Sequence, residues 1–551
     1  MFAFNLQEIA MAHGSKPLRG MESAAQSSIT TGKFGRMFRW LPPAFQPASD
    51  KESEDVVTLL ESIANLMIST EFNDRVDKEG KATPDTPIDE PEPDDENRSI
   101  AAGYTYFGQF VDHDITFDPA SSLQKENDPD ALEDFRTPRL DLDSLYGRGP
   151  DDQPYLFLRP GRSLFILGPD RGVAPMKRFD LARTSDNTAL IGDKRNDENK
   201  IVAQIHALFL AFHNKVFADL ASRFVGPQDQ QARFLETQRI VRWCYQWIVL
   251  NDFLPKICKP SVVKTVMNAG GGRPPKLEIY QPHSNSAYIP VEFSVAAYRF
   301  GHSMVRPSYL LNDVAKSTAQ FKSKGGKTTP FSRIPIFVPA STAPTDAMNG
   351  FGEALPVAWG IDWKFFFGTM PAATNGVRQI PQPSYRIDAT LVDPLGALPE
   401  FAPQFPPGSP FASLAFRNLL RGFRMGLPSG QAVARFLEAD VLSEENLWTK
   451  KGKGDSVVAW PEGKNFYNAN KRWLLGRAPL WFYILKEAEI DEKGHRLGEV
   501  GSRIVAETIV GLAWHDHFSY RFQNPKWTPA DEQIPGLTKT LDMLELTKYV
   551  G

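Results

Sequence analysis

The sequence contains little cysteine and no long apolar run. Cys244 and Cys258 are the only cysteines among 551 residues, so neither a disulfide framework nor a cysteine-based zinc or iron-sulfur site can be assembled. The best apolar run covers residues 478–485 and contains Pro479, whereas a membrane-spanning helix needs about 18 consecutive apolar residues. These absences predict a soluble globular protein with two reduced thiols and no transmembrane segment.

An excess of charge of either sign is also missing. The 62 Lys and Arg residues nearly balance 66 Asp and Glu residues, for a formal net charge of -4, so no global basic field attracts nucleic acid or an anionic membrane. Near the N-terminus Asn5, Gln7 and Glu8 interrupt the apolar residues, which leaves no apolar segment for a signal peptide. We expect no nucleic-acid partner, and a protein that is cytoplasmic or secreted without a conventional signal peptide.

Apolar residues recur at helical spacing in many segments, whereas Gly and Pro are concentrated between about residues 305 and 410. The 44 Pro residues exceed the usual share of about 5%. The sequence therefore predicts a mainly α-helical fold with long irregular connections and few short strands. Helices are expected over residues 56–68, from residue 100 to about 113 after an N-cap at Ser99, and over residues 199–224, 229–253, 291–304, 412–424 and 500–514.

The chain divides into two parts of different composition. Residues 82–97 are rich in Pro and acidic residues, a composition that cannot build a core and predicts an exposed loop. We interpret residues 1–98 as an N-terminal arm and this acidic loop, packed on a body. Residues 99–551 form that body as a single domain.

Histidine is the most informative residue type, because the common phosphate-binding, zinc-protease and serine-hydrolase motifs are absent. His113 lies between Asp112 and Asp114 and one helical turn after Gln109. Such a histidine can be a general base, a metal ligand or a partly buried structural residue. His302 ends another apolar segment and, taken alone, carries no functional signal.

Taken together, four segments resemble the animal-type haem peroxidases of the peroxidase-cyclooxygenase superfamily, in the family's order and over about residues 100–520. The segments are Gly108-Gln-Phe-Val-Asp-His-Asp114, Gly192-Asp-Lys-Arg-Asn-Asp-Glu-Asn199, Arg299-Phe-Gly-His-Ser303, and Asn418 ahead of Gly426-Leu-Pro428. The first string is highly specific. The chain looks like a bacterial member of the family, with residues 99–551 as its haem peroxidase catalytic domain.

The resemblance implies a bound haem b with a distal, peroxide-binding side. His113 matches the family's distal histidine, which takes a proton from one peroxide oxygen and returns it to the other. Arg195 matches the distal arginine, whose charge stabilises the departing hydroxide. Gln109 matches the distal amide that hydrogen-bonds water or a bound anion. These three residues are the expected catalytic group.

The resemblance also implies a proximal side. His302 matches the axial ligand of the haem iron, and Asn418 matches the residue that hydrogen-bonds the second ring nitrogen of that ligand. Arg299 and Arg421 match positions that hold the haem propionates through arginine-carboxylate pairs.

Covalent attachment of the haem is a further implication. Asp112 and Glu198 match the two family carboxylates that can form esters with haem methyl groups. Asn199 stands where the halide-oxidising leukocyte member of the family has a methionine that forms a third link. This departure argues against chloride oxidation.

A calcium site completes the resemblance. Asp114 pairs in the family with a loop of alternating oxygen donors, and that loop matches Thr137, Arg139, Asp141 and Asp143. Hard oxygen donors suit Ca²⁺, and main-chain carbonyls such as that of Arg139 can be among them. The alternative interpretation is a solvated, Asp-rich turn.

The function implied is the reduction of hydrogen peroxide and the oxidation of small one-electron donors such as phenols through a ferryl intermediate, with halide or thiocyanate as further candidate donors. A fatty-acid dioxygenase of the superfamily is one alternative, but its radical tyrosine lies three residues before the proximal histidine, where this chain has Arg299, and Tyr298 is one residue off. A haem-containing adhesion protein is another. The chain has no Arg-Gly-Asp sequence, and its complete distal trio favours turnover.

Overall fold

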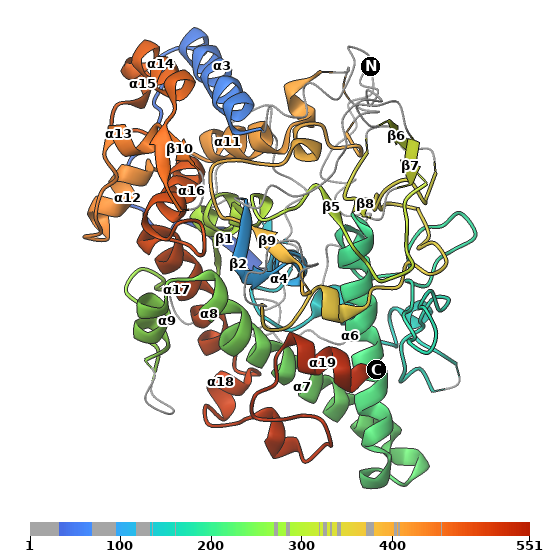
Figure 1. Cartoon of the computed structure of the whole chain (residues 1–551). Coiled ribbons are helices and arrows are strands. Elements are labelled where there is room, and N and C mark those ends of the chain that lie inside the picture. Colours follow the sequence, from blue (N-terminus) through green and yellow to red (C-terminus); the bar gives the residue numbers. More distant parts are fainter. Residues whose placement is uncertain are drawn as a thin grey trace, which may run out of the picture.

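The computed structural model is mainly helical, with few short strands, as the sequence predicted (Figure 1). It describes residues 32–68, 95–116, 133–134, 136–159, 161–268, 274–282, 287–318, 320–322, 328–330, 333–338, 343–370, 380–401, 405, 408–452 and 455–551. Residues 1–31 of the expected arm, and residues 82–94 of the expected acidic loop, lie outside the described residues.

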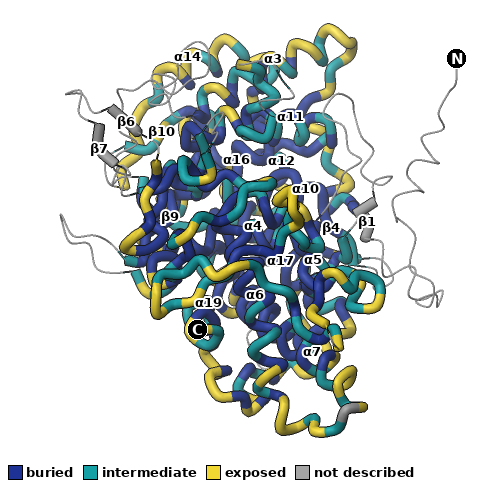
Figure 2. The backbone as a smooth tube through the Cα atoms, turned by 90° about the vertical axis from the view of Figure 1, so that its right-hand side faces the viewer, coloured by how far each residue is buried: buried dark blue, intermediate teal, exposed yellow. Residues whose placement is uncertain are grey.

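Three helices pack on one another in the lower half of the fold: α4 (Gly103–Ile115), α6 (Lys200–Asp219) and α7 (Gln230–Ile248). Helix α7 continues through a π-helical turn over Val249–Phe253, which confirms the helix predicted over 229–253. Figure 2 shows that α4 and α6 run through the buried interior. Helix α4 therefore presents its functional side chains inside the protein.

Helix α6 begins at Asn199 because the side chain of this residue accepts hydrogen bonds from the backbone amides of Ile201 and Val202. Among the described residues, one helical segment, Lys200–Arg223, is long and apolar enough to cross a membrane, and 78% of its apolar window is buried inside the protein. A helix that is apolar on all sides is typical of a protein core. We therefore read α6 as a core helix.

Helix α16 (Leu480–Asp491) packs against both α11 (Leu414–Arg424) and α17 (Glu499–His515), and α3 (Asp50–Met67) packs against α11 (Figure 1). The predicted helices over 56–68, 412–424 and 500–514 are thereby confirmed. Helix α3 starts six residues earlier than its first predicted apolar position, because Ser49 caps it by accepting from Glu52 N.

The segment predicted as one helix over 291–304 is two short pieces, so that prediction is wrong in its continuity. Helix α10 spans Val291–Val295, and a 3-10 helix spans Ala297–His302. Between them Ala296 has φ -127° and ψ -71°, outside the helical region. The break redirects the chain ahead of His302.

The predicted start of the distal helix at Ser99 is also wrong. Residues Glu96–Ala101 form strand β2, which pairs antiparallel with β9 (Pro383–Tyr385), and α4 starts only at Gly103. Glu96 and Asn97 are buried in this strand, so the end of the acidic segment is not an exposed loop as predicted. Pairing with a distant strand outweighs the helical spacing of the apolar residues.

The remaining strands are short. Strand β1 (Gly32–Gly35) pairs antiparallel with β3 (Glu133–Asp134) and parallel with β4 (Ile289–Pro290). The other pairs are β5 (Ser308–Tyr309) with β8 (Ile334–Pro335), β6 (Gln320–Lys322) with β7 (Thr328–Pro330), and β10 (Thr449–Lys451) with β11 (Val457–Ala459).

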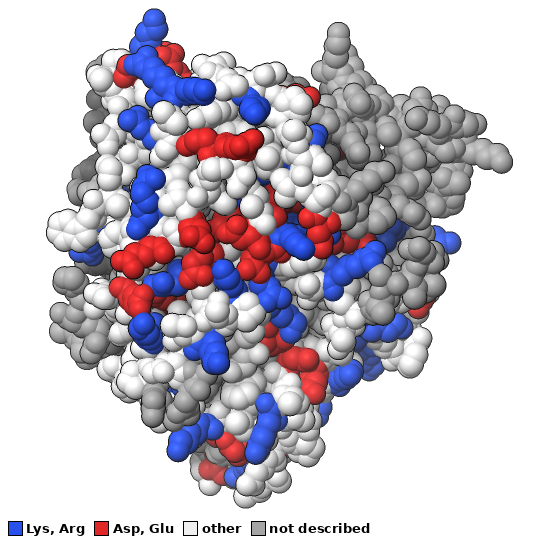
Figure 3. All heavy atoms as spheres, turned by 60° about the vertical axis from the view of Figure 1, so that its left-hand side comes forward, with Lys and Arg blue, Asp and Glu red and all other residues white. Residues whose placement is uncertain are grey.

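Shorter helices cover the outside of the body. They are α5 (Asp143–Tyr146), α8 (Leu254–Ile257), α9 (Pro260–Met267), α12 (Gly430–Phe436), α13 (Glu444–Leu447), α14 (Pro461–Ala469), α15 (Lys471–Leu474), α18 (Tyr520–Gln523) and α19 (Met543–Val550). Acidic and basic side chains are interspersed on the face seen in Figure 3, which fits the near balance of charge in the sequence.

Candidate active site

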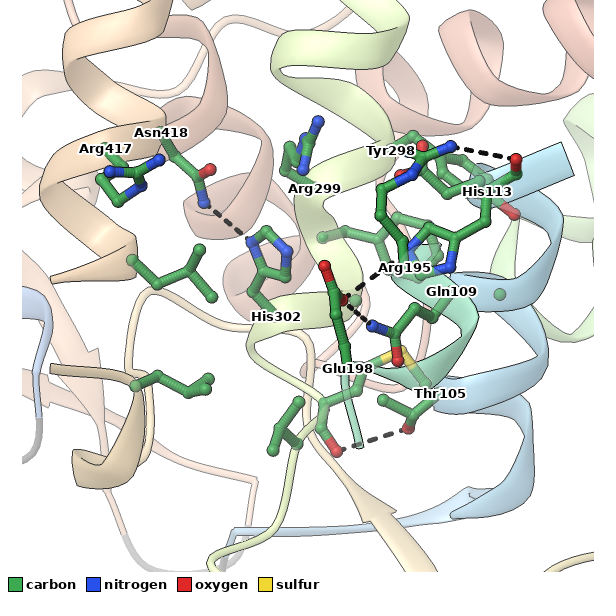
Figure 4. A pocket seen from close by; sticks show the side chains of 18 of the residues that line it. Thr105, Gln109, His113, Arg195, Glu198, Tyr298, Arg299, His302, Arg417 and Asn418 are labelled. Carbon is green, nitrogen blue, oxygen red and sulfur yellow. Dashed lines mark hydrogen bonds and ion pairs between the residues drawn. The ribbon is translucent and has the colours of Figure 1, made fainter. Parts of the chain in front are cut away.

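A cavity of about 360 Å³ lies between α4, the 3-10 helix over Ala297–His302 and α11. Side chains from these separate elements converge on it in Figure 4. Nine residues singled out from the sequence line this one cavity: Gln109, Asp112, His113, Arg195, Glu198, Arg299, His302, Asn418 and Arg421. The fold therefore brings both groups of expected site residues to a common space.

His113 lies near the end of α4 and is buried, with 4% of its surface exposed. Its Nδ1 lies 2.9 Å from Asn196 Oδ1, and its Nε2 lies 3.7 Å from Glu198 Oε2. Burial, assisted by the charge of Arg195, lowers the pKa of His113 to about 4. The imidazole is therefore neutral at neutral pH and can accept a proton at a ring nitrogen.

Arg195 is held beside His113 by a carboxylate that the sequence analysis did not single out. Its Nε and Nη2 donate to the two carboxylate oxygens of Asp193, at 3.1 and 2.7 Å, and its Nη2 also donates to the His113 carbonyl oxygen at 3.0 Å. Burial opposes ionisation of Asp193, but the guanidinium groups of Arg195 and Arg136 hold its pKa well below the usual range. This pairing fixes the guanidinium in place and offsets part of its charge.

Gln109 lies on the same wall of the cavity as His113 and Arg195 and bonds to two neighbouring side chains. Its Nε2 donates to Glu198 Oε2 at 2.7 Å, and its Oε1 accepts from Asn199 Nδ2 at 3.1 Å. Burial, followed by the charge of Glu400, raises the pKa of Glu198 to about 8. Glu198 is thus largely protonated at neutral pH. Asp112 lines the same wall, where its Oδ1 accepts from Thr116 Oγ1 at 3.1 Å.

His302 faces the cavity from the opposite wall (Figure 4). Its Nδ1 lies 2.8 Å from the amide nitrogen Nδ2 of Asn418 on α11. The oxygen and the nitrogen of the Asn418 carboxamide exchange places when the group turns by a half turn. With Oδ1 facing the ring, His302 Nδ1–H donates to it, and the lone pair of Nε2 is available. Burial, followed by the charge of Arg299, lowers the pKa of His302 to about 3, which keeps the imidazole neutral.

Three arginines line the cavity near His302: Arg299, Arg421 and Arg417. Arg299 Nε donates to the Ser294 carbonyl oxygen at 2.8 Å. Arg417 was not singled out from the sequence, although it lies on α11 one helical turn before Arg421 and one residue before Asn418. Its guanidinium stacks 3.8 Å from the centroid of the Phe401 ring, so the cavity has an additional cationic side chain at this end.

The residues of the expected calcium loop gather behind α4. One carboxylate oxygen each from Asp114, Asp141 and Asp143 lie within 4.8 Å of one another. Thr137 Oγ1 donates to Asp141 Oδ2 at 2.8 Å, and Arg139 N donates to the Thr137 carbonyl oxygen at 2.7 Å. Burial and the two neighbouring carboxylates raise the pKa of Asp114 well above its usual range. Mutual repulsion of this kind is relieved by a cation.

The comparisons with known proteins point to animal haem peroxidases. The sequence model of the animal haem peroxidase family matches residues 134–334, a segment that contains Arg195, Glu198 and His302, and its curated relatives and structural neighbours include peroxidases. Residues 134–334 therefore resemble an animal haem peroxidase domain. His113 and Asn418 lie outside the matched segment.

Two relatives illustrate how far the likeness to this family extends. A peroxidase-like protein of Margaritifera margaritifera is 28% identical over 258 residues, which cover 37% of this chain and 31% of that protein. Thyroid peroxidase of Mus musculus is 31% identical over 121 residues, which cover 21% of this chain and 12% of that protein. The chain thus matches less than a third of the length of either relative.

Solved structures show the same fold over most of the chain. Peroxidase A from Dictyostelium discoideum superposes with a TM-score of 0.55 at 16% identity, over 89% of each chain. A fatty acid alpha-dioxygenase from Oryza sativa superposes with a TM-score of 0.52 at 14% identity, over 83% of this chain and 73% of that one. At such identities the likeness concerns the helical haem peroxidase fold alone.

Proposed function

We propose that this protein is a haem-dependent peroxidase that reduces hydrogen peroxide and oxidises a small one-electron donor. The observation that carries the proposal is the placement of two neutral imidazoles on one cavity. His302, bonded to Asn418, lies on one wall, and His113, flanked by Arg195 and Gln109, lies on the other. A ligand imidazole and an acid-base imidazole are the two groups that this chemistry requires of the protein.

The cavity residues fit a haem. At Gly301, beside His302, an added Cβ would meet no heavy atom within 4 Å, so the backbone leaves room for a flat group to approach. His302 would be the axial ligand, and the Asn418 amide would fix its tautomer. Arg299 and Arg421, with Arg417 added, would hold the propionates through charge-assisted hydrogen bonds. The chemistry supplied by a bound haem is electron transfer to peroxide and from the donor.

The distal residues of this chain provide the proton transfers. Neutral His113 accepts a proton from peroxide at Nε2 and returns it to the departing oxygen, because its low pKa keeps that nitrogen unprotonated beforehand. Arg195 provides a fixed positive charge next to the His113 backbone, which stabilises negative charge that develops on oxygen. Gln109 orients Glu198 and is available to hydrogen-bond small molecules in the cavity.

Asp112 and Glu198 are the residues proposed to form ester bonds to the haem. Both line the cavity. Each ester would replace one C–H bond of a haem methyl group and the carboxyl O–H bond by a C–O bond, and hydrogen peroxide would take up the two electrons and two protons released as it is reduced to water. Haem that stays with the protein in acidified organic solvent would support attachment. Haem that extracts completely would limit the assignment to non-covalent binding.

A neutral phenolic donor is the proposed substrate class. Asn199 is bonded to Gln109 and supplies no sulfur atom for a third haem link. The dioxygenase alternative is less well supported, since Arg299 occupies the position of the radical tyrosine, three residues before His302.

The decisive experiment is an absorption spectrum followed by turnover. Purified protein, supplied with hemin during expression, should show a Soret band and oxidise a phenol such as guaiacol only when hydrogen peroxide is present. Fatty acid with oxygen serves as the competing assay. A preparation that takes up no hemin would exclude the proposal, and oxygen consumption with fatty acid in place of peroxide-dependent turnover would favour the dioxygenase.

We further propose that the cluster of Asp114, Asp141 and Asp143 binds Ca²⁺, together with oxygens of Thr137 and Arg139. Hard carboxylate and carbonyl oxygens on a closed loop are the donors that calcium prefers. The cluster also connects to the distal side. Arg136 contacts Asp143 Oδ1 at 3.4 Å and Asp193 Oδ2 at 2.6 Å, and Asp193 holds Arg195.

Calcium removal should therefore destabilise the protein and disturb its distal side. At a calcium concentration about 100 times the dissociation constant, binding contributes roughly 2.7 kcal/mol to the free energy of unfolding. The thermal midpoint should fall on addition of EGTA and recover with calcium. Asp143→Asn should abolish this response, whereas Asp152→Asn, at a nearby carboxylate paired with Arg148, should keep it. Equal midpoints with EGTA and with calcium would refute the site.

A further inference from the structure

A second buried histidine is connected to His113 by a side-chain amide. Asn196 Oδ1 lies 2.9 Å from His113 Nδ1, and Asn196 Nδ2 lies 3.0 Å from Nδ1 of His206 on α6. His206 and Asn196 are fully buried. From the sequence alone His206 is interpreted as a structural residue, and it does not line the cavity.

We propose that His206 is a positioning residue that acts through Asn196 to keep the distal His113 ready to accept a proton on the nitrogen facing the cavity. This inference rests on the proposed function. It concerns the hydrogen-bond chain from α6 through the 3-10 helix over Lys194–Asp197 to α4, and it assigns His206 no contact with substrate or haem.

The donors and acceptors of the Asn196 carboxamide fix the positions of the ring protons. The amide Nδ2 of Asn196 can only donate, so His206 Nδ1 must accept and carries no proton. The amide oxygen can only accept, so His113 Nδ1 must carry a proton. The remaining nitrogen of His113, Nε2, then has its lone pair free, 3.7 Å from Glu198 Oε2 within the cavity lining. The hydrogen bond at one ring nitrogen thus sets the state of the other.

The reversed amide would not support acid-base chemistry. With Asn196 Nδ2 turned toward His113, Nδ1 of that ring would accept, and the ring proton would lie on Nε2. That nitrogen could no longer take a proton from peroxide. Once His113 is protonated, both its nitrogens donate, so Asn196 Oδ1 must face it and Nδ2 must find an acceptor elsewhere. His206 Nδ1 is that acceptor, and a connected chain of hydrogen bonds strengthens each member.

The surroundings of His206 fix its ring for this role. The ring packs edge-on against Phe110, with centroids 6.1 Å apart and an interplanar angle of 73°. Phe110 lies on α4, one turn before His113. The second ring nitrogen of His206, Nε2, is buried with no hydrogen-bond partner among the described residues. The contact with Asn196 is thus the polar interaction through which this buried imidazole acts.

The test compares variants of the haem-loaded protein that do or do not keep an acceptor at residue 206. His206→Phe and His206→Leu both remove the two ring nitrogens. The Phe variant keeps an aromatic ring at this position, and the Leu variant does not. His206→Asn keeps an oxygen near the position of Nδ1. Gln204→Leu is the matched control, because Gln204 is another buried polar residue on α6, bonded to Trp359 O and Ile361 N away from the cavity.

The readout is the rate constant of cyanide binding to the ferric protein, since hydrogen cyanide must lose its proton to a base as it binds. We expect the rate constant of cyanide binding to decrease by ~10- to 10²-fold in His206→Phe and His206→Leu. This is at or below the lower end of the ~10²- to 10⁴-fold contribution of a positioned general base. His206→Asn should recover most of the rate. Gln204→Leu should lower the thermal midpoint but bind cyanide at the parent rate.

The outcomes separate the possibilities. Parent rates for the folded Phe or Leu variant would overturn the role of His206. An Asn variant as slow as the Phe variant would also overturn it, by reducing His206 to a packing residue. Absence of a Soret band in the parent protein would instead remove the proposed function, and the inference with it.

Discussion

Replacement of His302 by alanine is expected to abolish stable haem binding. His302 is the imidazole on its wall of the cavity, and burial keeps it neutral by lowering its pKa to about 3, so it can offer a lone pair to iron. Without it, the arginines and the apolar walls would hold the porphyrin only by weaker contacts. The ratio of Soret absorbance to protein absorbance, after expression with hemin and gel filtration, should fall to near zero.

Two further variants sharpen this expectation. Asn418→Ala should keep haem but weaken its retention by about 10- to 100-fold, the usual effect of losing the hydrogen-bond partner of a metal ligand. His517→Ala replaces a histidine that stacks on Phe522 away from the cavity and should retain parental haem content. A His302→Ala protein with full haem content and the parental ferrous spectrum would show that another residue is the axial ligand.

Replacement of His113 by alanine should leave haem content intact and slow the reaction with hydrogen peroxide by ~10²- to 10⁴-fold, the usual contribution of a positioned acid-base group. Haem is retained because His302 and Asn418 are unchanged. The measurement is stopped-flow absorbance in the Soret region with increasing peroxide. His113→Gln, which keeps a polar side chain but cannot shuttle a proton at neutral pH, should be similarly slow.

The pH dependence of the parent protein provides an independent check. Burial and Arg195 lower the pKa of His113 to about 4, so the imidazole is neutral above that pH and protonated below it. The rate constant with peroxide should fall as the pH drops through about 4, because a protonated ring cannot accept a proton. The His113→Ala variant should lack this decrease. Parental rates in that variant would mean that the distal assignment is wrong.

The fold could be predicted best where one helix carries its own signals. The α6 segment has a capping Asn199 and a continuous apolar face, and both its start and its class were predicted correctly. The start of α4 could not be, since the spacing of Ile100 and Tyr104 fits a helix equally well. The backbone of Glu96–Ala101 pairs instead with residues 383–385, and no local pattern reports so distant a partner.

In the candidate site, too, local sequence signals predicted some residues and contacts between distant segments brought in others. His113, Arg195 and His302 were found because each lies in a short contiguous string whose residues act together. The residues that hold these three side chains in place were not predicted. Asp193 is two residues before Arg195, but its contact with that guanidinium depends on the turn between them. Arg417 lies one residue before Asn418, yet only the direction of α11 shows that it, too, reaches the cavity.

Short strings of residues and helical periodicity were enough to predict the family resemblance, the helical class and the candidate site residues, because each of these is a local property of the chain. The tertiary structure decided which side chains hold those residues in their working states. The contacts of His113 with Asn196, and of Asn196 with His206, join α4 to a turn and a helix 83 or more residues further along the chain. Such contacts depend on packing in three dimensions, which no single segment encodes.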